Sequence, residues 1–165
     1  MKDLTYKLPG SLGIVIFSEA ALRTISTYRQ CGFFSKEAGG QLFAEIENGV
    51  MRIVDATEPR KKDRRGKFSF WPHRPTEQTE IKERFKKKGL HFVGDWHTHP
   101  ESTPSPSGSD ARSIAETMRQ SRHTLPGILL VIIGTLELPD GLYVGFQTKT
   151  MLYKLDVLTT GEKVV

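Results

Sequence analysis

The sequence contains a single cysteine, Cys31, among its 165 residues. One thiol cannot form a disulfide within the chain, and it cannot build a zinc site that needs several thiolates. We expect Cys31, near the end of a predicted helix, to be a small buried hydrophobic residue. The scarcity of cysteine and the lack of an N-terminal signal segment both favour a cytoplasmic location.

Long hydrophobic runs are also missing. The longest apolar run, Ile128–Ile133, is far shorter than the roughly 20 residues that a transmembrane helix needs. We therefore expect no membrane partner. The length favours one domain with a real hydrophobic core. We place that domain at residues 1–158 and interpret residues 159–165 as a C-terminal tail.

Positive charge is concentrated in two places, and the chain carries a formal net charge of +5. The cations cluster in the segments Arg60–Lys67 and Lys82–Lys88. Such runs are usually solvated faces. The alternative is a docking surface for an acidic protein or for nucleic acid, which would make the chain a basic adaptor. We do not expect nucleic acid to be a partner.

Hydrophobic periodicity predicts alternating strands and helices. A helix capped by Ser18 is expected to run to Gly32, and Asn48-Gly49 predicts a hairpin turn. Residues 59–79 are rich in charge, proline and aromatic residues, and we interpret them as an insertion loop. Strands are expected at 12–17, 35–45, 50–56, 90–99, 127–134, 142–149 and 151–158, and further helices at 77–88 and 110–121. The pattern indicates an α+β fold of the three-layer α/β/α type, with a mixed, mainly antiparallel sheet flanked by helices.

Two histidines and a carboxylate have the spacing of a metal site. Residues two apart in a strand face the same side, so His97 and His99 would project together as two imidazole ligands. Asp110, in the first turn of the next helix, can add a carboxylate. Three protein ligands leave one position open, which is typical of catalytic zinc. A water in that position would have its pKa lowered to about 7.

Ser107 lies three residues before Asp110, so helical geometry would place its hydroxyl where it could donate to the oxyanion of a tetrahedral intermediate. The same spacing has the form of a capping box, a role compatible with catalysis. Hydrolysis also needs a general base. Spacing alone cannot choose it, and Glu37, beside Gly39-Gly40, is one candidate among several. The alternative without a functional site is that His97 and His99 are ordinary strand histidines and that Glu37 is a surface carboxylate.

These residues resemble a known family. His97-x-His99, seven residues, Ser107, two residues and Asp110 match the full His-x-His-(x7)-Ser-x-x-Asp signature of the JAMM metalloproteases, whose fold is the MPN or JAB domain. The segment Glu37–Leu42 resembles the upstream Glu-x-Gly-Gly-x-Leu segment of that family. The resemblance implies that His97, His99 and Asp110 hold one zinc ion, that Glu37 is the general acid/base, and that Ser107 stabilises the oxyanion. Many MPN domains lack these residues and are scaffolds, so their presence implies an active enzyme.

The resemblance also implies a substrate. JAMM proteases typically cut an isopeptide or peptide bond after the C-terminal glycine of ubiquitin or a ubiquitin-like protein. The short chain and its 63–70 stretch look like the bacterial JAMM proteins of anti-phage operons such as type II CBASS. That likeness implies deconjugation of a nucleotidyltransferase or another conjugated protein in antiviral defence. We expect Gly39-Gly40 or residues 59–75 to offer a sheet edge to the substrate tail.

Three alternatives remain open. The same chemistry could process the C-terminus of a sulfur-carrier or ubiquitin-like protein. A zinc deaminase would have a similar, cytidine-deaminase-like layout, but the sequence lacks the paired Cys-x-x-Cys and the His-x-Glu of that class. The basic adaptor belongs to the binding class, and it would show a steep salt dependence of DNA binding.

Overall fold

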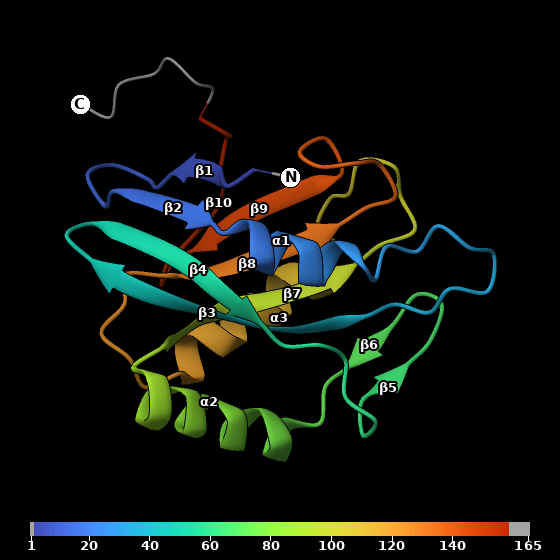
Figure 1. The fold of residues 1–165 in the computed structure, drawn as a ribbon, viewed down its shortest axis with the longest axis horizontal. Helices are drawn as coiled ribbons and strands as arrows, with labels where there is room; N and C mark the ends of the chain where they lie inside the picture. The colour runs from blue at the N-terminus through green and yellow to red at the C-terminus, as the bar shows by residue number, and fades with distance from the viewer. Residues whose placement is uncertain (1, 159–165) are drawn as a thin grey trace.

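Eight strands form one mixed sheet in the computed structural model, which describes residues 2–158 (Figure 1). The predicted tail at 159–165 lies outside the described residues. The strands are β1 (Leu4–Lys7), β2 (Ile14–Phe17), β3 (Gly39–Glu47), β4 (Val50–Ala56), β7 (His91–Thr98), β8 (Ile128–Ile133), β9 (Leu142–Gln147) and β10 (Leu152–Lys154). They follow the order β1-β2-β4-β3-β7-β8-β9-β10. The pairs β2–β4 and β7–β8 are parallel and the other pairs are antiparallel, so the predicted mixed sheet is confirmed.

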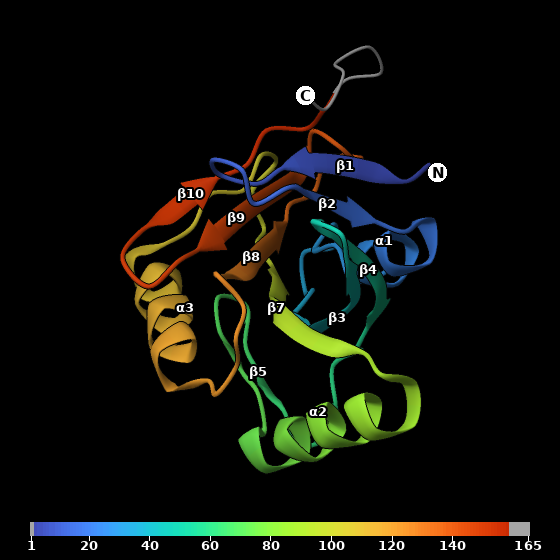
Figure 2. The same cartoon turned by 90° about the vertical axis from the view of Figure 1, so that its left-hand side faces the viewer.

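The described helices cover both faces of this sheet (Figure 2). α1 (Glu19–Ser26) packs on one face, against β4. α2 (Arg74–Lys88) and α3 (Gly108–Gln120) lie on the opposite face, α2 against β7 and α3 against β8 and β9. This arrangement confirms the predicted α+β layering. None of the helices within residues 2–158 is long and apolar enough to cross a membrane.

β8 lies inside the sheet, between β7 and β9. All six of its residues are buried. Leu129, Val131 and Ile133 join the large core cluster that α1 covers. Ile128, Leu130 and Ile132 join a second cluster with residues of α3. A strand buried on both faces has no polar side to alternate with, which explains the uninterrupted apolar run.

The sheet curls until its first strand meets the chain that leaves its last strand. Tyr6 of β1 forms an antiparallel bridge with Val157. The N–H of Leu158 donates to the carbonyl oxygen of Thr5 at 2.7 Å. Figure 2 shows β1 close to the chain beyond β10. This contact covers part of an edge that an open sheet would present to other chains.

The first helix begins where predicted but ends earlier. The Ser18 hydroxyl accepts a hydrogen bond from the backbone of the first turn, which makes Ser18 the N-cap. The helix then stops at Ser26, so the predicted end at Gly32 was wrong. The N–H of Tyr28 bonds to the carbonyl of Ile25. Such i to i+3 bonds tighten the last turn and end the helix.

The turn after α1 is more exposed than the sequence suggested. Cys31 is exposed, so the expectation of a buried residue was wrong. The early end of the helix carries this segment away from the core. Phe33 and Phe34 follow it and are 79% and 90% exposed. These two rings form an exposed aromatic pair beside the segment that leads into β3.

The predicted insertion loop contains a hairpin. β5 (Arg64–Arg65) pairs with β6 (Phe70–Trp71) in a separate two-stranded sheet. α2 begins at Arg74, earlier than the predicted start at Glu77. Pro75 lies in the first turn, where the helix does not need its missing N–H. The insertion is therefore a folded unit that ends at the start of α2.

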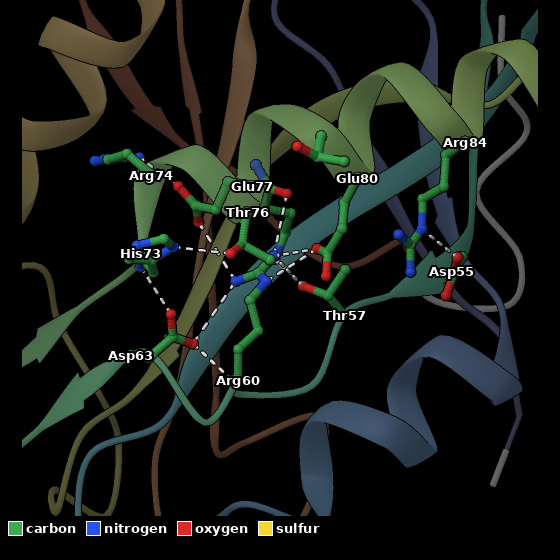
Figure 3. Close-up of polar contacts among 12 residues, drawn as sticks. Asp55, Thr57, Arg60, Asp63, His73, Arg74, Thr76, Glu77, Glu80 and Arg84 are labelled. Atoms are coloured by element: carbon green, nitrogen blue, oxygen red, sulfur yellow. Dashed lines mark hydrogen bonds and ion pairs between the residues drawn. The ribbon is translucent and has the colours of Figure 1, made fainter.

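Arg60 holds this insertion against α2 (Figure 3). Its side chain is 9% exposed. The Nε atom donates to Glu80 Oε2 at 3.0 Å, and Nη1 lies 3.7 Å from a carboxylate oxygen of Asp63 and 3.7 Å from one of Glu77. A planar guanidinium suits such a contact with several carboxylates. The polar residues of α2 thus have internal partners, which explains why its most buried residue is Glu77.

Asp63 closes the base of the hairpin. Its two carboxylate oxygens accept the backbone N–H groups of Arg60 at 2.7 Å and of His73 at 2.8 Å. The first basic cluster is therefore partly structural, because Arg60 is engaged inside the protein. This lowers the number of cations that a docking surface at Arg60–Lys67 could offer.

Replacing Arg60 by alanine should destabilise the protein, because the buried carboxylates of Asp63 and Glu77 would lose a counter-charge. Breaking a buried ionic contact on one side costs about 3–5 kcal/mol. The free energy of unfolding, measured by denaturant titration, should fall by that order in Arg60→Ala. Lys62→Ala is the matched control at an exposed position, with an expected change within about 0.5 kcal/mol. Equal stability of the two variants would contradict a structural role for Arg60.

Candidate metal centre

Two histidine side chains converge where β7 ends. His97 lies in β7 and His99 follows its last residue, and their Nε2 atoms are 3.1 Å apart. Both imidazoles project to one side, as the two-residue period of an extended strand requires. The Nδ1 atom of His99 lies 3.8 Å from a carboxylate oxygen of Glu101. A carboxylate behind the imidazole in this way helps to orient a metal-ligating histidine.

Asp110 brings a carboxylate to the same point from the first turn of α3. Its Oδ1 lies 3.3 Å from His97 Nε2, and its Oδ2 lies 3.4 Å from His99 Nε2. The three side chains therefore surround one point with three donor groups. The helix fixes the position of Asp110, and the strand fixes the positions of the histidines.

Ser107 and Asp110 also form the capping box that the sequence suggested. The N–H of Ser107 donates to Asp110 Oδ2 at 2.7 Å, and the N–H of Asp110 donates to Ser107 Oγ at 3.2 Å. The Ser107 hydroxyl donates to Asp110 Oδ2 at 2.7 Å. Capping and orientation of the carboxylate toward the histidines are thus one arrangement. The Ser107 hydroxyl lies at the exposed edge of the donor group.

Glu37 reaches the same point from the segment that precedes β3. It is 7% exposed, and its carboxylate lies within 4.8 Å of the ligand atoms of His97 and His99, a set that could hold a metal ion. The strand register explains this closeness, because Gly39 pairs with His97 across β3 and β7. The structure therefore brings together all five residues proposed for the site, and it offers two carboxylates, Asp110 and Glu37, to the histidines.

The hairpin of the insertion holds the backbone of Glu37. The N–H of Glu37 donates to the carbonyl of Gly66 at 2.7 Å, and Arg65 Nε donates to the carbonyl of Glu37 at 2.7 Å. Glu37 thus lies between the hairpin and β7. Arg65 is an internal contact of the site, so the basic cluster loses a second cation to structure.

A buried polar network joins the same parts from behind. Thr98, between the two histidines, is fully buried, as expected for a residue that faces away from them. Its Oγ1 accepts the N–H of Ala38 at 3.0 Å and donates to Gln30 Oε1 at 2.9 Å. Gln30 Nε2 donates to the carbonyl of Lys67 at 3.0 Å. One hydroxyl thus links the histidine strand, the Glu37 segment and the tip of the hairpin.

The pKa values of the two carboxyl groups in the site are shifted in opposite directions. Burial is the largest influence on Glu37 and raises the pKa of its carboxyl group, although His97 and His99 act against it. Burial would also raise the pKa of Asp110, but the hydrogen-bonding imidazoles of His97 and His99 outweigh it and hold that pKa well below its usual range. The hydrogen bond to Asp110 raises the pKa of His99. Carboxylates whose pKa values are pushed apart are suited to different roles, an ionised ligand and a proton carrier.

A cavity of about 100 Å³ opens beside the donor group. Glu37, His97 and Asp110 line one part of it, and Asp95 and Glu77 line another. Burial raises the pKa of Asp95 to about 7, and the charge of Glu77 adds to this effect. The cavity therefore joins the candidate metal centre to a second charged region, which Arg74 also lines.

Sequence reasoning missed Arg65, Gln30 and Asp95. Only Asp95 had a usable signal, because it lies two residues before His97 and so faces the same side of β7. The contacts of Arg65 and Gln30 join segments far apart in the sequence, and no spacing rule reports them.

Gly39 and Gly40 lie where other parts of the protein come very close. Another backbone does come close, since a Cβ on Gly40 would lie 2.3 Å from the Thr57 carbonyl oxygen. Gly39 and Gly40 pair with β7 on one side, and the pairing of β3 with β4 begins only at Leu42, so a substrate edge at these glycines stays a prediction. A Cβ on Gly39 would also meet the Phe70 ring at 2.6 Å. These glycines serve internal packing.

Replacing Thr98 by valine keeps the shape of the side chain and removes its hydroxyl. The N–H of Ala38 and Oε1 of Gln30 would lose their partner, and each buried unsatisfied group costs about 1–3 kcal/mol. We expect the midpoint of chemical unfolding of Thr98→Val to fall accordingly. Thr103→Val, at an exposed position, should leave the midpoint nearly unchanged. Wild-type stability of Thr98→Val would show that this network does not stabilise the site.

Comparisons with known proteins point to one family. Residues 18–145 match the family model of prokaryotic homologues of the JAB domain. A Vibrio cholerae protein named CD-NTase/cGAS isopeptidase is 30% identical over 80% of this chain and 83% of its own length. An Escherichia coli protein of the same name is 32% identical over 61% of this chain, and the match spans 65% of that protein, just under two thirds of its length.

The fold also has a solved counterpart. The solution structure of a Desulfitobacterium hafniense protein superposes with a TM-score of 0.60 and 18% identity, over 84% of this chain and 87% of that protein. At this identity the likeness concerns the fold alone. The family match covers both the histidine strand and the Glu37 segment. The chain therefore belongs to the family of prokaryotic JAB-domain homologues and is an enzyme of the JAB metalloprotease class.

Proposed function

We propose that this chain is a zinc-dependent isopeptidase or peptidase that cleaves after the C-terminal glycine of a ubiquitin-like tail and so releases a conjugated protein. The observation that carries the proposal is the convergence of Glu37, His97, His99 and Asp110 on one point, with the Ser107 hydroxyl beside it. Relatives named CD-NTase/cGAS isopeptidases support a nucleotidyltransferase as the conjugated protein. Anti-phage defence in the cytoplasm is the corresponding biological role.

The donor set fits zinc. The Nε2 atoms of His97 and His99 are 3.1 Å apart, and each lies 3.3 or 3.4 Å from one of the two carboxylate oxygens of Asp110. A tetrahedral zinc site with bonds of about 2.0–2.1 Å has ligand–ligand edges of about 3.3 Å. His97, His99 and Asp110 would hold the ion. A bound zinc ion supplies a Lewis acid that polarises a carbonyl group and acidifies a water molecule.

The protein's own residues then divide the proton chemistry. Glu37, whose pKa burial raises, takes the proton of the attacking water and returns it to the leaving amine. Asp110, whose pKa is held low, remains ionised as a ligand. The Ser107 hydroxyl turns from Asp110 to donate to the oxyanion. Three roles thus follow from three different local environments.

The hairpin is the best surface for the substrate tail. β6 pairs with β5 on one side, and within residues 2–158 no strand pairs with its other side. An extended tail can add to a free edge of this kind through main-chain hydrogen bonds. Phe70 of β6 lines the cavity beside the donor group, and Trp71 is 57% exposed. We assign the substrate tail to this hairpin edge.

Processing of a sulfur-carrier or ubiquitin-like precursor would use the same residues. The two functions differ in the leaving group, which is a lysine side chain in deconjugation and a peptide in processing. Activating and ligase-like genes nearby would favour deconjugation, and thiolation genes would favour processing. The basic adaptor has weaker support, since Arg60 and Arg65 are engaged internally.

Substitutions should separate metal binding from proton transfer. Glu37→Gln should keep one zinc per chain and lose cleavage of a glycine-ended ubiquitin-like fusion by about 10²–10⁴-fold, the usual contribution of a general base. Asp110→Ala should lose both zinc and activity. Zinc content is measured by elemental analysis and cleavage by gel. Glu45→Gln, at an exposed position of β3, is the control, and full activity in Glu37→Gln would sink the assignment.

Arg65 should act as a positioning residue, because the hydrogen bonds of its side chain go to the backbone carbonyls of Glu37 and Lys36. We expect Arg65→Ala to lower kcat by up to about 100-fold, as small misplacements of a catalytic group do. KM and zinc content should change little, and Arg65→Lys should recover part of the loss. Lys62→Ala serves as the control on the same insertion. A rise in KM alone would show instead that Arg65 binds the substrate.

A further inference from the structure

The cavity beside the metal centre continues along the sheet toward the start of α2. The apolar part of its wall comes from three elements: Phe70 and Pro72 from the hairpin, Ile114 from α3, and Leu130 from β8. Asp95, Glu77 and Arg74 line another part of it. A space of about 100 Å³ with an apolar part and a charged part can take one long side chain with a polar tip.

Asp95 is the unusual group in this cavity. It lies on the same face of β7 as His97, one step further along the strand. Its Oδ1 is buried, and no group within residues 2–158 donates a hydrogen bond to it. Buried carboxylate oxygens in native proteins are nearly always hydrogen-bonded, so an orphan oxygen needs an explanation.

Glu77 provides the contrast. It is 2% exposed, but Arg74 donates to its Oε2 at 2.9 Å, and Arg60 lies 3.7 Å from its Oε1. Its charge is therefore balanced inside the protein. The acceptor without a donor among the described residues is Asp95 Oδ1, and Asp95 lines the same cavity as the candidate metal centre.

We propose that this cavity is a specificity subsite that receives a lysine or arginine side chain of the substrate next to the scissile bond. The methylene groups of such a side chain would pack against Phe70, Pro72 and Ile114. Its ammonium or guanidinium group would give Asp95 Oδ1 the hydrogen-bond donor that it lacks, in a part of the cavity that Arg74 also lines. The inference rests on the proposed peptidase function, and it adds a side-chain preference that the metal centre alone does not supply.

A peptide panel tests the preference. Peptides with a glycine at the cut carry lysine, arginine, citrulline or norleucine at each flanking position in turn. We expect wild-type kcat/KM to favour lysine or arginine over the neutral residues by at least tenfold at one position. Asp95→Asn should reduce that ratio to about twofold or less. Asp140→Asn, at an exposed position, should keep the wild-type ratio.

A binding measurement makes the test independent of turnover. n-Butylguanidinium is titrated into the metal-loaded protein, with neutral n-butylurea as its isosteric control. The indole N–H signal of Trp96, which also lines the cavity, reports occupancy by NMR. We expect the cation to bind at least tenfold more tightly than the urea, and Asp95→Asn to abolish the difference.

The outcomes separate this inference from the proposed function. Cleavage without a basic preference, together with equal binding of the two probes, would overturn the subsite and leave the peptidase standing. Asp95-dependent binding of the cation without cleavage of any peptide would support the subsite and count against the peptidase. Tight binding of the urea alone would show that the cavity takes a neutral donor, which also overturns the basic subsite.

Discussion

The contact between Ala38 and Thr98 is the constraint on which the site depends. Thr98 donates its N–H to the Ala38 carbonyl at 2.8 Å and receives the Ala38 N–H on its hydroxyl. Ala38 follows Glu37, and Thr98 separates His97 from His99. Two backbone segments sixty residues apart are thereby fixed in register, and the side chains on either side of them must meet. Packing of α3 against β8 then places Asp110 beside the point where Glu37, His97 and His99 already meet.

This dependence explains how much of the site could be predicted from the sequence. The spacing of His97, His99 and Asp110 reports local geometry, a strand with period two and the first turn of a helix, and local geometry is what spacing encodes. Glu37 entered only through family resemblance, because its place depends on strand pairing. The hairpin and the burial of Arg60 were missed for a related reason. From the sequence alone, a charged segment is predicted to be exposed to solvent. Its burial becomes predictable only when its carboxylate partners, here in α2, are known to lie nearby.

The insertion has more than one task. Asp63 ties its two ends together, Arg65 and Gly66 hold the backbone of Glu37, and Phe70 forms a wall of the cavity. A single folded unit thus contacts the proton carrier and the surface assigned to the substrate. Some of its positively charged side chains are engaged in these internal contacts. Charge composition alone therefore overstated the basic surface, while one aromatic residue of the insertion, Phe70, lines the cavity beside the site.

The capping box at Ser107 and Asp110 has a thermodynamic consequence. The oxygen of Asp110 that accepts the Ser107 N–H is the one that faces His99. Fraying of the first turn of α3 would therefore withdraw a donor from the centre, and any ion held there would oppose fraying. Linkage makes the two effects equal in free energy. The start of α3 and the occupancy of the centre thus form one cooperative unit, whose local opening is tied to the availability of the ion.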